Sequence, residues 1–211
     1  MRERPILFNA DMVRAVLNGS KTQTRRMLSP RHLELIGLAA RAGECSPLES
    51  GHQHANSQSY YREFCPFGAV GDRLWVRETW SEDFANYYPH DRVWYAAADD
   101  RRLDIEVVDG VRGIFSPESN VHVPFRWRPS IHMPRWASRI TLEITGVRVE
   151  PLQTITLGDI CKEIGCSLYD FRPATDGFRV WAELWNSIYG EDSWQANPWV
   201  WVVEFKRVEG D

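Results

Sequence analysis

The stretch RITLEITGVRVEPL, residues 139–152, carries the clearest strand pattern in the chain. Its apolar residues recur at every second position and resume in the same way beyond Gly146: Ile140, Leu142 and Ile144, then Val147 and Val149. Period-two hydrophobicity indicates a strand with one buried face, and a glycine within such a strand marks a kink or a bulge. We therefore predict one long, kinked strand here.

Three further stretches predict strands. In PWVWVVEFKRV (198–208), one side of the strand would carry Trp199, Trp201, Val203 and Phe205. In GDRLWVRETW (71–80), Leu74 and Val76 alternate with Arg73, Trp75 and Arg77. The third is VWYAAA (93–98), which is rich in strand-forming residues.

Helical signals lie between these strands. A short helix is predicted in DMVRAVLNG (11–19), with Asp11 as N-cap and Gly19 after its end, and another in TLGDICKEIG (156–165). The clearest amphipathic helix is DGFRVWAELWNSIYG (176–190), whose apolar face would comprise Phe178, Trp181, Leu184, Trp185 and Ile188. Residues 29–64 lack periodicity and are interpreted as a long loop insertion; residues 99–123 form a second insertion with a hairpin.

Together these elements predict an α+β chain: a small mixed β-barrel with helices packed on it, forming one domain over residues 1–211. The 43% hydrophobic content supports a substantial core, and the net charge of −4 gives no global attraction to nucleic acid. No apolar run approaches the roughly 20 residues of a membrane helix. The beginning of the chain lacks the apolar segment of a secretory signal, and the four cysteines suit reduced thiols. We therefore expect a cytoplasmic protein without membrane contact.

The polar stretch NGSKTQTRRM (18–27) allows two interpretations. It is either a solvated turn after a helix, with its cations at the helix C-terminus, or the edge of a functional site. On an ideal strand Lys21 and Thr24 would point to opposite faces, because they are three residues apart. They converge only on a helical turn or a bend, which Gly19 and Ser20 permit.

A second polar constellation is WRPSIHMPRWASR (127–139), which two prolines stiffen. It either displays arginines and Trp136 to a phosphate-and-base ligand, or leads into a strand with Met133 and Trp136 in the core. Trp75 is similarly either exposed for stacking or covered by a helix. Glu78 is expected to orient Lys21 or an arginine.

One loop region contains four zinc-type ligands: Cys45, His52, His54 and Cys65. Zinc is a weaker alternative here, because the region lacks the paired C-x-x-C spacing of a zinc knuckle. We expect no cofactor. Cys161 and Cys166, which flank Glu163, are interpreted as buried thiols.

Four stretches together resemble the ASCH-domain proteins often encoded in phages and prophages. They are PILFNADMVRAVLNGSKTQTRR, CPFGAVGDRLWVRETW, WRPSIHMPRWASRITLEITGVRVEPLQTI and VWVVEFKRV. The resemblance covers both ends and the middle of the chain, but not the two insertions. It implies a PUA-like barrel, a fold used largely on RNA and modified nucleosides.

One branch of that family is similar to an amidohydrolase acting on N4-acetylcytidine, which uses a lysine and a threonine in a K-T-x-T segment and a glutamate on a short helix. The resemblance therefore implies Lys21 as base, Thr24 as nucleophile and Glu163 as acid. The residues expected to bind RNA or a modified nucleoside are Arg25, Arg26, Trp75, Arg77, Ser130, His132 and Arg135. Two alternatives stay open: a ribonuclease using Lys21, and a non-catalytic module that binds RNA or phage proteins.

Overall fold

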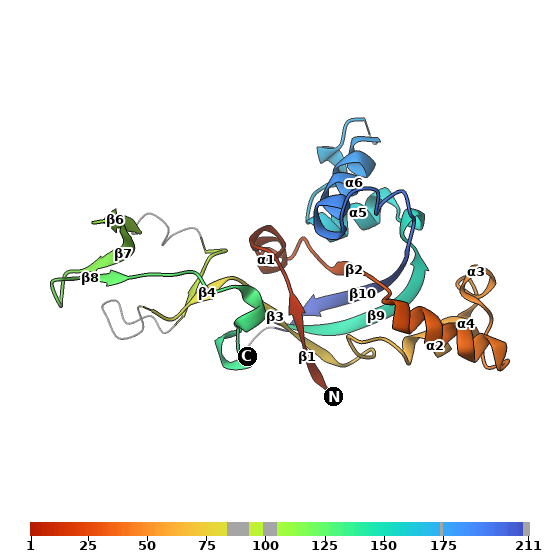
Figure 1. Ribbon diagram of the computed structural model, residues 1–211. Helices are drawn as coiled ribbons and strands as arrows, with labels where there is room; N and C mark the ends of the chain where they lie inside the picture. Colours follow the sequence, from red (N-terminus) through yellow and green to blue (C-terminus); the bar gives the residue numbers. More distant parts are fainter. Residues whose placement is uncertain (84–92, 99–104, 174, 209–211) are drawn as a thin grey trace.

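A curved five-stranded sheet lies at the centre of the computed structural model (Figure 1). Its strand order is β1 (Glu3–Leu7), β3 (Arg73–Arg77), β9 (Thr141–Pro151), β10 (Trp199–Arg207) and β2 (Gln23–Met27). The β1–β3 pair is parallel and the other pairs are antiparallel. The sheet is open, with β1 and β2 as its edge strands, and the structure describes residues 1–83, 93–98, 105–173 and 175–208. The predicted α+β class is confirmed.

The predicted kink in β9 is a bulge. Gly146 pairs with Glu204, but the next pair is Ile144 with Phe205, so Thr145 is the extra residue. The bulge shifts the alternation by one, and both Ile144 and Val147 therefore enter the same core. A Cβ atom at Gly146 would lie 2.7 Å from Glu204 Oε2 and 3.3 Å from Glu204 Cβ, so a larger residue there would have to displace the Glu204 side chain.

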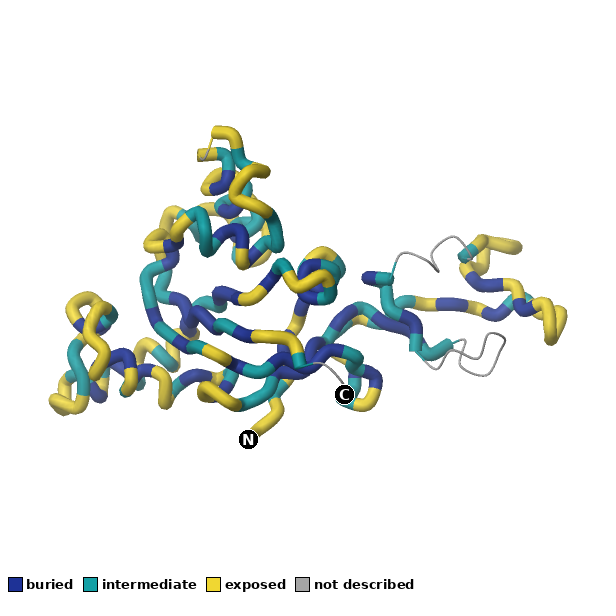
Figure 2. Tube along the Cα trace, turned by 180° about the vertical axis from the view of Figure 1, so that it is seen from behind, coloured by how far each residue is buried: buried dark blue, intermediate teal, exposed yellow. Residues whose placement is uncertain are grey.

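Strand β10 is buried on both faces. Trp201, Val203 and Phe205 pack into one core, as the sequence predicts. Val200 and Val202 face a second core, made with α5 (Leu157–Ile164) and α6 (Thr175–Tyr189). In Figure 2, buried and intermediate residues make up most of the central strands.

The two predicted short helices are present. Helix α1 (Ala10–Leu17) is capped by Asn9 rather than Asp11, because the Asn9 side chain accepts from the Met12 N–H. Helix α5 begins with a capping box between Thr156 and Asp159 and ends at Gly165, which has a φ of 84°. On α6, Trp181 and Trp185 are buried, whereas Phe178 and Ile188 are partly exposed.

The prediction of a loop over residues 29–64 is wrong. This region forms α2 (Pro30–Arg41), α3 (Leu48–Gly51) and α4 (Ala55–Arg62). Few apolar residues of these helices face the core, so the helical period is weak in the sequence. On α4 the contact with the sheet is polar: Gln58 Nε2 donates to the Val149 carbonyl at 2.6 Å, and its Oε1 accepts from the Val149 N–H at 2.9 Å. The Gln58 amide thus makes with the Val149 main chain the pair of hydrogen bonds that a neighbouring strand would make.

An arm projects from the body (Figure 1). It contains the sheet β6 (Glu106–Val108), β7 (Val111–Ser116) and β8 (Val121–Pro124), together with the pair β4 (Trp80–Ser81) and β5 (Trp94–Tyr95). This confirms a hairpin in the second predicted insertion; residues 99–104 of that insertion lie outside the described residues. Of the strand predicted over residues 93–98, only Trp94 and Tyr95 form a strand, β5. In the described part of the chain, no helix has the length and apolar character needed to cross a bilayer.

Candidate functional site

The polar stretch after α1 is not a solvated turn. Residues 23–27 form the edge strand β2, and Lys21, Thr24 and Arg25 each keep 3% or less of their surface exposed. Backbone bonds fix this path, because Lys21 N–H donates to Ala15 and Thr22 N–H donates to Lys162 of α5. The stretch is therefore held between α1 and α5, and its charged side chains point into the protein.

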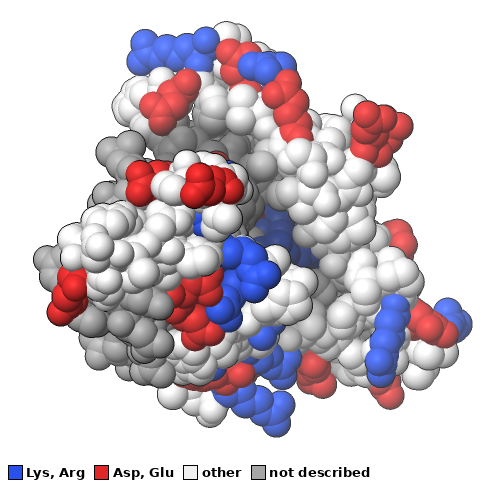
Figure 3. Space-filling view, turned by 60° about the vertical axis from the view of Figure 1, so that its left-hand side comes forward, with Lys and Arg blue, Asp and Glu red and all other residues white. Residues whose placement is uncertain are grey.

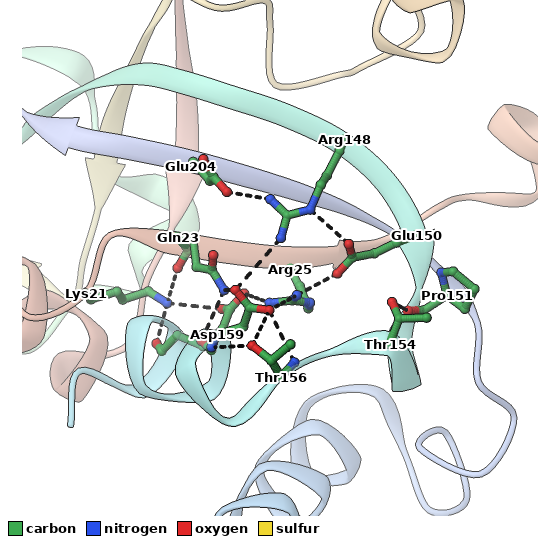
Figure 4. A network of polar contacts seen from close by, with 11 residues as sticks. Lys21, Gln23, Arg25, Arg148, Glu150, Pro151, Thr154, Thr156, Asp159 and Glu204 are labelled. Carbon is green, nitrogen blue, oxygen red and sulfur yellow. Dashed lines mark hydrogen bonds and ion pairs between the residues drawn. The ribbon is translucent and has the colours of Figure 1, made fainter. Parts of the chain in front are cut away.

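Lys21 is bound at the outer edge of β2. Its Nζ donates to the Gln23 carbonyl at 2.8 Å and to the Glu163 carbonyl at 2.5 Å, and lies 3.4 Å from Glu163 Oε2 (Figure 4). The ring of Phe8 lies 5.4 Å from the same nitrogen. Lys21 thereby ties the edge of β2 to both the main chain and the carboxylate of Glu163.

Arg25, which lies within β2, contacts three carboxylates. Its Nη1 lies 3.1 Å from Glu163 Oε1, and its Nη2 lies 2.6 Å from Glu150 Oε1 and 3.5 Å from Asp159 Oδ2. The Arg25 side chain is fully buried. A buried guanidinium is tolerable only when paired, and these carboxylates supply that pairing.

A second arginine, Arg148 on β9, extends the network toward the surface. Its Nε lies 2.9 Å from Glu150 Oε2 and its Nη1 lies 2.5 Å from Glu204 Oε1. Gln23 Nε2 donates to the main-chain oxygen of Asp159 at 3.1 Å and lies 3.3 Å from its Oδ1. Figure 4 shows these side chains bridging β2, β9, β10 and α5.

The environment lowers the pKa of Lys21. Burial is the largest cause; Glu163 opposes it, while Arg26 and Arg25 add to it. The two neighbouring arginines thus favour the neutral amine, as like charges do.

For the pKa of Asp159, in contrast to that of Lys21, the neighbouring groups outweigh the effect of burial. Burial alone would raise its pKa, but hydrogen bonds from the Thr156 hydroxyl and N–H, with Arg25 and Arg148, outweigh burial and lower it.

Thr24 and Glu163 line one narrow crevice. Its other polar residues are Arg25 and Arg26, and α6 and Met12 form its apolar wall through Met12, Trp181, Leu184, Trp185, Ile188 and Tyr189. The cavity volume is only about 10 Å³. Glu163 thus contacts Lys21 and lines this crevice together with Thr24, whereas Lys21 is not among the residues that line it.

Arg26 lies beside this crevice and links the two edges of the sheet. Its Nη2 donates to the Leu7 carbonyl of β1 at 2.7 Å, and its guanidinium lies 5.7 Å from the centre of the Phe8 ring. Strands β1 and β2 are therefore connected by a side chain where main-chain pairing ends.

The other predicted binding residues lie elsewhere. Trp75 is 8% exposed and is covered by the guanidinium of Arg77, 4.7 Å from its ring, rather than by a helix. Ser130 and His132 belong to the short helix η2 (Ser130–His132), and Arg135 to η3 (Arg135–Ala137).

These three residues do not line the Thr24 crevice. Arg135 Nε instead lies 2.9 Å from Glu3 Oε2. The segment that contains them forms helical turns, so the predicted extended display is wrong. Met133 is fully buried, whereas Trp136 is 49% exposed.

Glu78 binds an arginine, which is one of the two roles predicted for it. Its carboxylate accepts two hydrogen bonds of 3.0 Å from Arg139 Nε and Nη2. Lys21 binds Glu163 instead.

The structure does not bring the four residues of the zinc alternative together. No group of three possible ligands occurs in the described part of the chain, which contains all four proposed residues. His52 instead packs edge-on against Trp199, and His54 is the N-cap position of α4. Cys45 and Cys65 are free thiols.

Cys161 and Cys166 are free as well, Cys161 buried and Cys166 half-buried. Burial and the neighbouring Cys161 side chain raise the pKa of Cys166 to about 12. The Cys166 side chain is therefore a protonated thiol at neutral pH.

Sequence reasoning missed four members of the network: Gln23, Arg148, Glu150 and Asp159. A signal for two of them was present, because Arg148 and Glu150 alternate with Val147 and Val149 and so share the face opposite the first core. With this geometry established, comparison with known proteins adds nothing: no family model, no curated protein and no solved structure matches the chain.

Proposed function

We propose that this chain is an ASCH-type protein with a PUA-like barrel that acts in the cytoplasm on RNA or a modified nucleoside. Its proposed reaction is hydrolysis of the amide of an N4-acylated cytidine. The observation that carries the proposal is that Glu163 contacts the buried amine of Lys21 and lines the same crevice as Thr24.

The residue chemistry supports amide hydrolysis. Burial favours the neutral amine of Lys21, and Glu163 Oε2 at 3.4 Å is near enough to hold the proton that Lys21 releases. In this form Lys21 accepts the Thr24 proton as Thr24 Oγ1 attacks the acyl carbon. Glu163 then donates its proton to N4 of the cytidine as the C–N bond breaks.

The second half of the reaction restores the enzyme. Water adds to the acyl group on Thr24, the ester bond to Oγ1 breaks, and the carboxylic acid leaves. The proton on Lys21 returns to Glu163 by the same 3.4 Å contact, and Thr24 recovers its own proton from the attacking water. One amide and one water thereby give one acid and one amine.

Two further features support the proposal. The bond from Arg26 to Leu7 draws the two edge strands together, which suits a barrel closed by side chains. On the face seen in Figure 3, lysine and arginine side chains gather at a hollow near the middle of the molecule. A basic hollow suits the phosphate of a nucleotide or RNA.

The decisive experiment is incubation with N4-acetylcytidine, free and within a short RNA. We expect cytidine and acetate as products, loss of turnover in Thr24→Val, and partial activity in Thr24→Ser. Thr145→Val is the matched control, because Thr145 is exposed on the β9 bulge. RNA breakdown without deacetylation would replace the proposal with a ribonuclease, and binding without turnover would replace it with a non-catalytic module.

A further inference from the structure

Strand β9 has an open edge beyond its contact with β3. Strand β3 pairs only with residues 141–143 of β9, and the last main-chain bonds on that side join Ile144 to Gly71 and Asp72. On the other side, β10 pairs with β9 over nearly its whole length. Within the described chain, residues 145–151 of β9 therefore have one side that no other strand covers.

Val147 presents its main-chain N–H and C=O to this open edge. Alternate residues of an antiparallel strand direct these groups to opposite sides. Val149, two residues along, bonds outward to the Gln58 amide through both groups, so Val147 also points outward. The Val147 side chain lies in the first core. Among the described residues, its two outward main-chain groups have no hydrogen-bond partner.

The Gln58 amide shows which group fits such an edge. Its N–H donates to the Val149 carbonyl at 2.6 Å, and its oxygen accepts from the Val149 N–H at 2.9 Å. A planar group with an N–H beside a C=O thus satisfies the main chain of one β9 residue. Main-chain groups out of contact with bulk water are nearly always paired, so the free pair at Val147 favours a ligand of the same pattern.

Helix α4 brings an arginine to the free pair. Arg62 follows Gln58 by four residues, so both project from the same face of α4, about 6 Å apart along its axis. Val147 and Val149 are separated by a similar length of β9, about 6.8 Å. Arg62 and Val147 accordingly line one cavity of about 270 Å³. Arg62 is exposed, and its guanidinium has no ion pair with a described residue.

We propose that this cavity binds a nucleotide through the amide edge of its base. Uracil and guanine each carry a ring N–H beside a C=O, which is the pattern of the Gln58 amide. The base donates its N–H to the Val147 carbonyl and accepts from the Val147 N–H, while Arg62 binds the phosphate. The other lining residues are Val70, Thr145, Gly146, Arg148 and Glu204. The volume is close to the lower end of ligand sites, about 300 Å³, which suits a single base.

The short length of the open edge argues against an added peptide strand. A peptide that extends a sheet bonds to several alternate residues of the edge. Here Ile144 is already bonded to Asp72 and Val149 to Gln58, so Val147 alone is available between them. The site does not include Thr24, and the inference does not rest on the proposed acyl transfer.

Uridine 5′-monophosphate is the probe, with its N3-methyl derivative as the matched control ligand. In ¹⁵N NMR titrations, uridine 5′-monophosphate should move the Val147 amide proton downfield and slow its exchange. The N3-methyl derivative should bind at least about 10-fold more weakly, because its methyl group replaces the donor and faces the Val147 carbonyl. Equal affinity for the two nucleotides, or an unmoved Val147 amide, would overturn the inference. A Val147 shift caused by an acidic peptide alone would replace it with strand addition.

Arg62→Gln tests the phosphate contact at an exposed position. We expect at least about 5-fold weaker binding of uridine 5′-monophosphate and less than about 2-fold change for uridine, which lacks the phosphate. Arg41→Gln is the control, because Arg41 is also exposed in the last turn of a helix but does not line this cavity. Unchanged nucleotide affinity in Arg62→Gln would overturn the phosphate contact. Deacylation of N4-acetylcytidine should stay at the wild-type level in Arg62→Gln, so this inference and the proposed function fail separately.

Discussion

Lys21 Nζ lies 2.5 Å from the main-chain oxygen of Glu163 and 3.4 Å from its carboxylate oxygen Oε2. One side chain thus binds both the backbone and the functional group of a residue 142 positions away. The contact fixes the end of α5 against the free edge of β2, and any change in it alters the position of Glu163. It therefore joins the stability of the fold to the chemistry of the site.

Replacing Lys21 with methionine should destabilise the protein and abolish deacylation. Methionine fills similar volume, but the carbonyls of Gln23 and Glu163 lose their donor and Glu163 keeps only Arg25 as its close cation. Breaking a buried charge pair costs about 3–5 kcal/mol, and the remaining arginine favours the lower end. Urea unfolding gives the stability change and N4-acetylcytidine turnover the activity.

Exposed Lys206, which pairs with Glu143 at 3.1 Å, offers a matched control. Lys206→Met should change the free energy of unfolding by less than about 1 kcal/mol, because surface pairs contribute little. Equal destabilisation by both lysine substitutions would show that the Lys21 contact is not special.

A methyl group at Gly165 should displace the end of α5. Its φ of 84° is unfavourable for alanine, and a Cβ atom would lie 2.5 Å from the Cβ of Ala15 on α1. Gly165→Ala should therefore destabilise the protein by about 1–3 kcal/mol and lower turnover by moving Glu163, two residues earlier. Thermal unfolding and turnover are measured on the same preparation.

Gly158 on the same helix provides the contrast. A Cβ atom there would find its nearest neighbour at 3.8 Å, so Gly158→Ala should be neutral or stabilise by up to about 1 kcal/mol. The comparison separates the close approach of α5 to α1 from the general effect of alanine in a helix.

The strands were predictable because their apolar residues alternate, and the bulge was visible as the shift from Ile144 to Val147 around Gly146. The helices of residues 29–64 were not predicted, because few of their residues, such as Ile36, Leu48 and Tyr61, enter the core, and α4 also contacts β9 through the Gln58 amide, which no hydrophobic pattern reveals. The expectation that the three-residue spacing places Lys21 and Thr24 on opposite faces applies only if both residues lie in one strand. Lys21 precedes β2, which begins at Gln23, so strand geometry does not apply to it.

The carboxylates around Arg25 show a second limit of sequence reasoning. Glu150 and Asp159 come from β9 and α5, and only the pairing of β9 with β10 and β10 with β2 brings them to Arg25. Their residue types were visible, but their convergence depends on strand order. The resemblance suggested Lys21, Thr24 and Glu163 as site residues, and the fold adds the groups that contact Lys21 and Glu163.

Removing the Gln58 amide should detach α4 from β9. In Gln58→Leu, both main-chain groups of Val149 lose their partners, and the leucine side chain cannot replace them. A buried group left unsatisfied costs about 1–3 kcal/mol, so we expect a loss of at least 2 kcal/mol and faster amide exchange at Val149. Gln53→Leu, at an exposed position nearby, should leave both measurements unchanged.

Acid should weaken the network in part through Asp159. Because the pKa of Asp159 in the folded protein is lower than its ordinary value of 3.8, the folded state binds fewer protons than the unfolded chain in this range. Its stabilising contribution is therefore complete above pH 3.8 and is lost as the pH falls through the lower folded value. We expect the stability difference between wild type and Asp159→Asn to be constant from pH 7 to about 5 and to shrink at lower pH. Urea unfolding across this range measures it, and a difference that grows on acidification would mean that Asp159 is not held as the carboxylate by Thr156, Arg25 and Arg148.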